Sequence, residues 1–340
     1  MANDPRWPTV DSLGPLTILG SGGEAEVFAI ANDPSRVVKI FKQTLRRELH
    51  AEGLMRTIDL LNQFTTTERE ILATSTVWPQ LPVREQDALV GFIMPRIDES
   101  YLFTYGRREE LGAEIGMART LRTWSHLSYR DVAFSREAIV TDMPNLSLPS
   151  ERTTLVELMR RLSQVFEILH GKNVVVGDGS GNNILWRAKP TVEVLVIDCD
   201  GFRVAGERAV TAAKQSPDWF DPELKGATNI ESDRYKLALA VYRGFFSKGL
   251  EVPHSSEVAD DFDRRVLEYA IRGTTTGDRP TAQEWRILFD TYVAEEEKRA
   301  REKRLEGRGR LSWEKDDGES IRLEAGPGPS PGRSNLNWRT

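Results

Sequence analysis

The sequence predicts an α+β fold in which a small, β-rich N-terminal part precedes a larger, mainly helical part. Two observations predict this class. Residues 15–41 contain three short apolar runs separated by turn-forming residues, whereas residues 152–170, 231–247 and 280–293 carry apolar side chains at helical spacing. The length of 340 residues agrees with about two domains of ~150 residues each.

The first three strands are expected within residues 15–41. An apolar run ends at Leu19, a second covers Val27–Ile30 and a third covers Val37–Phe41, with a turn at residues 32–35. This spacing predicts an antiparallel start to the chain.

A helix is expected next, over residues 44–61, where leucine and isoleucine recur at roughly helical spacing. Glu48 and Glu52 are four residues apart, so they are expected on one face of this helix. Residues 87–95 then predict a strand that ends at a proline, and we expect a domain boundary near residues 96–99.

The second part begins with an amphipathic helix over residues 152–170, with Gly171 as its stop. Further helices are expected over 231–247 and 280–293. Beyond about residue 295 the sequence becomes highly charged and then rich in Gly, Pro and Ser, which predicts a charged helical extension followed by a disordered tail.

Composition excludes several classes of function. The net charge of −6 provides no general attraction to nucleic acid, and no apolar stretch approaches the 18 residues of a membrane span. The N-terminus lacks the layout of a signal peptide, so a cytoplasmic protein is expected. Cys199 is the single cysteine and the four histidines are scattered, so neither an internal disulfide nor a zinc site is expected; we interpret Cys199 as a buried packing residue.

Two stretches could form part of a functional site or simply form turns, and for the first of them the pattern is one that binds phosphate. The first is Gly20-Ser21-Gly22-Gly23-Glu24-Ala25, but a dinucleotide-binding unit would need a helix directly afterwards and an acidic residue about 20 positions further on. The β-rich residues that follow favour a hairpin that covers a nucleotide, with a plain structural turn as the alternative. Lys39 lies inside an apolar strand, so it either meets an anion or points to solvent.

The second stretch is Gly177-Asp178-Gly179-Ser180-Gly181-Asn182-Asn183, which lies between apolar runs. Such residues are common turn formers, and a turn without function is the simple alternative. Asp198 follows Asn183 by fifteen residues, directly after an apolar run.

Taken together, these residues resemble the protein kinase superfamily. That resemblance implies a bilobal fold, with an N-terminal extension at 1–13, an N-lobe at 14–98, a C-lobe at 99–294 and an extension and tail at 295–340. It implies that ATP lies under Gly20, Ser21, Gly22, Gly23 and Val27 and beside Met94, that Lys39 contacts the phosphates, that Asn183 and Asp198 hold Mg²⁺, and that Asp178 accepts the hydroxyl proton. Glu52 or Glu48 would orient Lys39, and the family's layout favours Glu52.

The resemblance covers residues 14–293. Ser216–Glu223 resembles the Pro-Glu end of an activation segment, Asp233 a helix-anchoring aspartate, and Arg279 the arginine that pairs with Glu223. The chain is most similar to a divergent bacterial Ser/Thr kinase-like group, through Trp78-Pro79, Gly91-Phe92-Ile93-Met94-Pro95, Gly177-Asp178 and Ile197-Asp198-Cys199-Asp200.

The departures from the family pattern affect the expected control and rate. Val176-Gly177 replaces His-Arg, which puts control by loop phosphorylation in doubt, and Ser180 replaces a lysine that would neutralise the transferring phosphoryl group. Cys199-Asp200 replaces Phe-Gly, and Asp200 is expected either to cap a turn or to add a metal contact. Tyr129-Arg130-Asp131 looks like a catalytic motif, but Arg136 stands where Asn is needed, so we interpret it as part of an insert.

The resemblance implies phosphoryl transfer from ATP·Mg²⁺ to Ser or Thr of a protein substrate, with Thr211 and Ser216 as candidate self-phosphorylation sites and the 295–340 tail as a candidate recruiting segment. Two alternatives stand beside it. One is a pseudokinase that binds nucleotide or acts as a scaffold, and the other is a small-molecule kinase.

Overall fold

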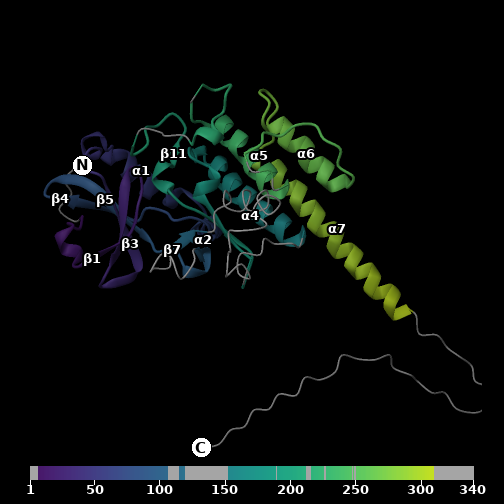
Figure 1. Ribbon diagram of the computed structural model, residues 1–340, viewed down its shortest axis with the longest axis horizontal. Helices are drawn as coiled ribbons and strands as arrows, with labels where there is room; N and C mark the ends of the chain where they lie inside the picture. The colour runs from purple at the N-terminus through teal and green to yellow at the C-terminus, as the bar shows by residue number, and fades with distance from the viewer. Residues whose placement is uncertain are drawn as a thin grey trace, which may run out of the picture. The chain divides into compact units, whose positions relative to one another are not determined.

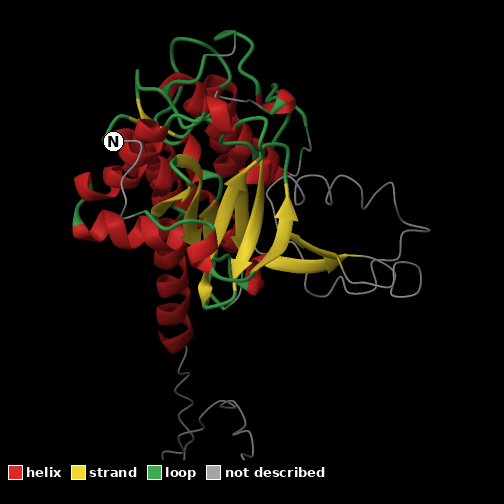
Figure 2. Ribbon diagram, turned by 90° about the vertical axis from the view of Figure 1, so that its left-hand side faces the viewer, coloured by secondary structure: helices red, strands yellow, loops and turns green. Residues whose placement is uncertain are grey.

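The computed structural model describes residues 7–105, 115–118, 152–188, 190–211, 216–225, 227–246, 248 and 250–309. The chain divides into two compact units, Met1–Ala294 and Glu295–Thr340. The first unit has an antiparallel sheet in its N-terminal part and mostly helices in its C-terminal part (Figures 1 and 2). The expected α+β class is confirmed.

Five strands form the sheet in the order β1-β2-β3-β5-β4, and every neighbouring pair is antiparallel. Their bounds are β1 Leu16–Ser21, β2 Ala25–Ile30, β3 Asp33–Phe41, β4 Leu81–Glu85 and β5 Ala88–Pro95. The turn expected at residues 32–35 is shorter than predicted, because Ile30 pairs with Asp33 and leaves only two residues between the strands.

The two faces of the sheet build separate cores, as the two-residue period of a strand requires. In β3, Val38 points into a cluster with Val83, Val90 and Ile93, whereas Phe41 packs on the opposite face with Phe92.

Residues from the 7–13 segment contribute to both of these cores. Trp7 is buried in the cluster around Phe41, and Val10 and Leu13 pack against the other cluster. The backbone N–H of Val10 also donates to the carbonyl of Arg84 at 3.0 Å.

The helix expected over residues 44–61 is divided into two. A single 3₁₀ turn, η2 (Arg46–Glu48), is followed by helix α1 (Ala51–Leu60). The break occurs at His50, whose backbone is extended and whose N–H donates to the carbonyl of Val210 at 2.8 Å. A contact with a distant part of the chain has overridden local helical spacing.

The remaining helices form most of the C-terminal part. They are α4 Arg152–Gly171, α5 Ile230–Phe246, α6 Asp261–Gly273 and α7 Ala282–Gly309, and α2 Thr66–Ser75 follows α1 in the N-terminal part. Helices α4 and α5 agree with the predicted ranges. The helix expected at 280–293 and the charged extension are one continuous helix, and the tail beyond Gly309 lies outside the described residues.

The other elements of the described chain are short. They are β6 Leu102–Tyr105, β7 Ile115–Ala118, β8 Val174–Val175, β9 Ile184–Arg187, β10 Glu193–Val196 and β11 Arg203–Val204, with 3₁₀ turns η1 Asp11–Leu13, η3 Leu61–Gln63, η4 Glu99–Tyr101, η6 Gly181–Asn183, η7 Cys199–Gly201 and η8 Pro217–Trp219.

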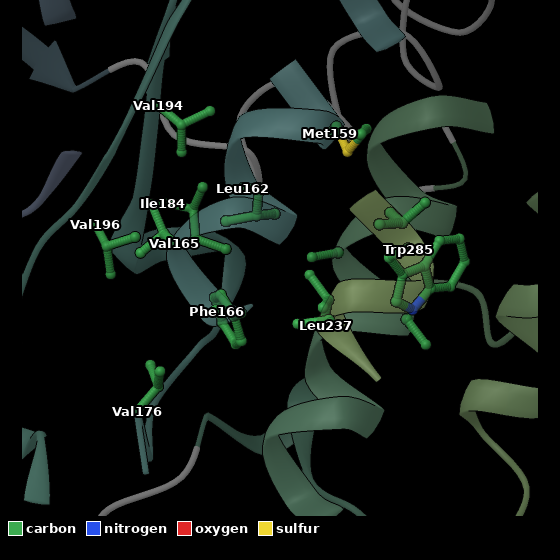
Figure 3. Close-up of a cluster of buried hydrophobic side chains, with 14 of the residues drawn as sticks. Met159, Leu162, Val165, Phe166, Val176, Ile184, Val194, Val196, Leu237 and Trp285 are labelled. Atoms are coloured by element: carbon green, nitrogen blue, oxygen red, sulfur yellow. The ribbon is translucent and has the colours of Figure 1, made fainter. Parts of the chain in front are cut away.

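Helix α4 supplies the centre of the larger core. Figure 3 shows Val165 and Phe166 of this helix between the hairpin residues Ile184 and Val196 on one side and Leu237 of α5 on the other. Fully burying a side chain of this size contributes about 1.5–3 kcal/mol. The core therefore fixes the hairpin β9–β10 against α4, and Asn183 and Asp198 lie just before and just after this hairpin.

Candidate functional site

Lys39 lies on the face of the sheet that carries the cluster around Phe41 and Phe92. Strand pairing sets Val27 opposite Lys39 and Lys39 opposite Phe92, so these side chains share one face. Its ammonium group lies over the rings of Phe41 and Phe92, 5.6 and 5.5 Å from their centroids, and the side chain is only 10% exposed. A cation in this position must meet an anion, and the alternative of a solvent-directed lysine does not hold.

Two carboxylates meet Lys39. Its Nζ lies 2.8 Å from Oδ1 of Asp200 and also donates to Asp198. Burial alone would lower the pKa of Lys39, but the charges of Asp200 and Asp198 outweigh burial and raise the pKa above its ordinary value. Burial raises the pKa of Asp200 to about 6 even though Lys39 opposes that shift.

The expectation that Glu52 or Glu48 would pair with Lys39 is wrong. The Glu52 side chain is 67% exposed and lies 3.8 Å from Arg56, while Glu48 lies in η2 and not on α1. Helix α1 turns its other face inward: the Thr57 hydroxyl donates to the carbonyl of Phe202 at 2.7 Å.

Close packing at Gly53 reinforces this orientation of α1. A Cβ at position 53 would lie 2.9 Å from the carbonyl oxygen of Arg208. Asp200, expected to cap a turn or to touch metal, is instead the buried partner of Lys39.

The hairpin β9–β10 brings Asn183 and Asp198 together. Its last strand pair is Ile184 with Val196, and the N–H of Ile197 donates to the carbonyl of Asn183 at 2.9 Å. Both candidate metal ligands therefore lie at one end of the hairpin. Asp198 has φ of 63°, a left-handed conformation that is uncommon for a residue other than glycine and that clusters at functional sites.

Asp178 completes the group. The Asn183 side-chain amide donates to the Asp178 carboxylate at 3.1 Å and to its carbonyl at 2.9 Å. Burial raises the pKa of Asp178, and the charge of nearby Asp198 acts in the same direction. A carboxylate with a raised pKa is a suitable proton acceptor, which is why such groups mark candidate sites.

Asp233 and Lys236, both on α5, hold the backbone that carries Asp178. The buried carboxylate of Asp233 accepts the N–H groups of Val176 and Gly177 at 2.6 and 3.0 Å. Lys236, also fully buried, donates to the carbonyl of Gly177, and its charge opposes the rise in the pKa of Asp178. Sequence reasoning found Asp233 but missed Lys236, although a lysine within the apolar run of α5 is a visible anomaly.

Ser216, from the segment after Asp198, also reaches this site. Its hydroxyl lies 3.4 and 3.5 Å from the two oxygens of the Asp178 carboxylate. Thr211, the other candidate acceptor, is half-buried.

The ion pair expected between Arg279 and Glu223 is present, but Arg279 has a second and closer partner. Arg279 pairs with Asp221 through two hydrogen bonds, and both side chains are at most 1% exposed. Glu223 lies 3.4 Å away and is 41% exposed. Burial of a doubly bonded pair makes Asp221 the stronger partner.

The glycine loop lies between β1 and β2. A Cβ at Gly20 or Gly23 would have no atom within 4 Å, and the one at Gly22 would meet only a carbonyl oxygen at 3.6 Å. The protein's own packing therefore does not require glycine here. Open space over the backbone is what a close-lying phosphate needs.

Other predicted positions are placed as follows. Met94 pairs with Val37 and is half-buried on the Lys39 face. Cys199 is 1% exposed and burial raises the pKa of its thiol well above the ordinary value, which confirms a packing residue. The motif at Tyr129-Arg130-Asp131 lies outside the described residues.

The oxygen donors of Asp198 and Asn183 suit Mg²⁺, which is commonly held by one or two carboxylates together with substrate phosphates. Among the residues that the structure describes, no three His, Cys, Asp or Glu side chains are grouped to hold a metal ion. A metal at Asp198 would thus depend on oxygens of a bound ligand.

Neither the family models nor the curated proteins that were searched contain a match to this chain. Within the described ranges, no helix is both long and apolar enough to cross a membrane.

Proposed function

We propose that this protein is an ATP- and Mg²⁺-dependent phosphotransferase with a bilobal, protein kinase-like fold, and that it acts on Ser or Thr hydroxyls of proteins. One observation carries the proposal. Lys39, Asp178, Asn183 and Asp198 come from three separate segments: Lys39 donates to Asp198, Asn183 donates to Asp178, and a backbone hydrogen bond from Ile197, the neighbour of Asp198, to Asn183 links the two pairs. A set of one buried cation, one proton acceptor and two oxygen donors for metal has the composition that phosphoryl transfer requires.

In the proposed reaction, the acceptor oxygen attacks the γ-phosphorus, the bond from that phosphorus to the bridging oxygen breaks, and ADP leaves. The hydroxyl proton passes to the Asp178 carboxylate, whose position is fixed by Asn183. The ammonium of Lys39 binds and orients the phosphates. Asn183 and Asp198 would hold Mg²⁺, which supplies neutralisation of the developing charge.

The position of Ser216 supports a hydroxyl acceptor. Its Oγ lies 3.4 Å from the nearer Asp178 oxygen, which shows that a serine side chain fits beside the proposed proton acceptor. The segment that carries Ser216 also contains Asp221, which is bound to the buried Arg279. An acceptor peptide would therefore approach a surface that is fixed to the helical core.

The test is intact-mass spectrometry of phosphatase-treated protein after incubation with ATP and Mg²⁺. We expect the parent to gain phosphoryl groups and the Asp178→Asn and Asp198→Ala variants to gain none. Glu52→Gln is the matched control and should behave like the parent. The Glu52 carboxylate is exposed, and among the described residues it forms an ion pair only with Arg56. Equal incorporation in parent and Asp178→Asn would overturn the proposed role.

Substrate class is tested in the same preparation. ATP consumption is measured with a mixture of Ser/Thr peptides and with a panel of aminoglycosides and sugars. Consumption with the small molecules alone would revive the small-molecule kinase. Nucleotide-dependent thermal stabilisation without any transfer, on protein or added substrates, would favour the pseudokinase.

A further inference from the structure

The lysine of the candidate site has an unexpected pair of partners. Asp200 lies in the 3₁₀ turn η7 and Asp198 directly precedes that turn, and neither carboxylate comes from helix α1. We propose that Asp200 is the positioning residue of Lys39, so that the phosphate-contacting lysine is anchored from the metal-binding segment itself. The role of Lys39 in this inference rests on the proposed function.

Exposure separates the parts played by the two aspartates. The side chain of Asp198 is 49% exposed, whereas that of Asp200 is 6% exposed. An exposed carboxylate can turn toward a metal ion in solvent, but a buried one has no such route and needs a fixed partner. Asp200 can therefore keep Lys39 in place while Asp198 moves from the lysine to Mg²⁺.

The local backbone explains how both groups reach the same lysine. Turn η7 (Cys199–Gly201) follows the left-handed Asp198, and it places Cys199 in the core with its thiol donating to the carbonyl of Val196 at 3.3 Å. The side chains on either side of Cys199 then both reach the ammonium of Lys39. Replacement of glycine by aspartate at position 200 thus has a structural use that the sequence alone did not reveal.

Helix α1 is not available for the same task. Thr57 bonds the carbonyl of Phe202, Gly53 packs on the carbonyl of Arg208, and Glu52 is left on the solvent side. A rotation that brought Glu52 inward would break these contacts. We therefore expect the lysine to be positioned without any contribution from Glu52.

The first experiment needs no nucleotide. The midpoint of thermal unfolding is compared for the parent, Lys39→Met, Asp200→Asn and the variant that carries both substitutions. A matched control cycle uses Glu52→Gln instead of Asp200→Asn. We expect each Lys39 and Asp200 substitution to lower the midpoint by several degrees, and the double variant to lose no more than the worse single one. Additive losses for Lys39 with Asp200 would overturn the inference.

The second experiment measures affinity for the Mg²⁺ complex of a non-hydrolysable ATP analogue by titration calorimetry. Asp200→Asn should weaken binding about tenfold in the parent and have no effect in Lys39→Met, a loss of about 1.4 kcal/mol that disappears with its partner. A purely structural aspartate would weaken both backgrounds equally. Weakening by Glu52→Gln as large as by Asp200→Asn would also overturn the inference.

The two proposals fail in different ways. If the parent does not bind the analogue, the proposed function fails, while the nucleotide-free cycle still tests the pair. If Asp200→Asn does not fold, acylation of Lys39 followed by mass spectrometry replaces it, with Asp198→Asn and Glu52→Gln as the variants. Lys39 should stay protected in both because Asp200 is intact, and increased labelling in Glu52→Gln would contradict the inference.

Discussion

Two loops that carry predicted site residues are packed in opposite ways. The loop that carries Asp178 is held by two buried side chains of α5. Asp233 accepts two backbone N–H groups of this loop, and Lys236 donates to the carbonyl of Gly177. At the glycine loop, an added Cβ at Gly20 or Gly23 would have no atom within 4 Å. The difference indicates that packing within the protein fixes the backbone of the first loop and leaves the backbone of the glycine loop open.

The largest expected effect is a loss of stability when the buried anchor of the Asp178 loop is removed. Asp233→Asn removes a fully buried charge that accepts two backbone N–H groups and should lower the free energy of unfolding by about 3 kcal/mol. Denaturant titration measures this loss. Asp261→Asn, whose side chain is 90% exposed beside Arg264, should change the same quantity by less than about 0.5 kcal/mol. Equal losses would mean that Asp233 does not anchor the loop.

An intermediate effect is expected on the pH dependence of activity, through the charge of Lys236. The proposed reaction needs ionised Asp178, so activity falls as pH drops through its pKa, which burial raises and Lys236 partly lowers. Lys236→Met removes that opposing charge, so the acid limb of the pH–rate profile should move to higher pH. Lys298→Met, with a side chain that is 77% exposed, should leave the limb in place. A shift to lower pH would contradict this assignment.

The smallest effect on stability is expected at the glycine loop. Gly20→Ala should change the free energy of unfolding by less than about 0.5 kcal/mol, because its Cβ would meet no atom. Affinity for the ATP analogue should nevertheless fall about tenfold if phosphate lies against this backbone. Gly171→Ala is the control, since position 171 is equally open and lies at the end of α4. Unchanged affinity in Gly20→Ala would place the nucleotide elsewhere.

Local patterns predicted the elements that local physics decides. The strands around Lys39 and the amphipathic helices α4 and α5 follow from two- and 3.6-residue periods, and their described bounds are close to the predicted ones. Helix α2 could also have been found, because Thr65 and Glu68 form a capping box that is visible in the sequence.

Long-range contacts decided the rest. The predicted helix at 44–61 is interrupted because His50 bonds Val210, and Glu52 faces outward because α1 is packed on residues that follow Asp198. Asp200 replaces the expected partner of Lys39, and Asp221 joins Glu223 as a partner of Arg279; no spacing rule indicates which of several nearby carboxylates a buried cation will meet. The residue types of the site were predictable, but the pairing among them was not.

The buried thiol of Cys199 gives this protein a built-in reporter of site opening. It is the single cysteine of the chain, it is 1% exposed, and it lies between the two aspartates that hold Lys39. A thiol reagent can reach it only when η7 leaves the core, so the labelling rate of the native chain counts those openings. Binding of a nucleotide complex that restrains Asp198 would therefore slow labelling of the Cys199 Sγ, although the complex would not contact that sulfur.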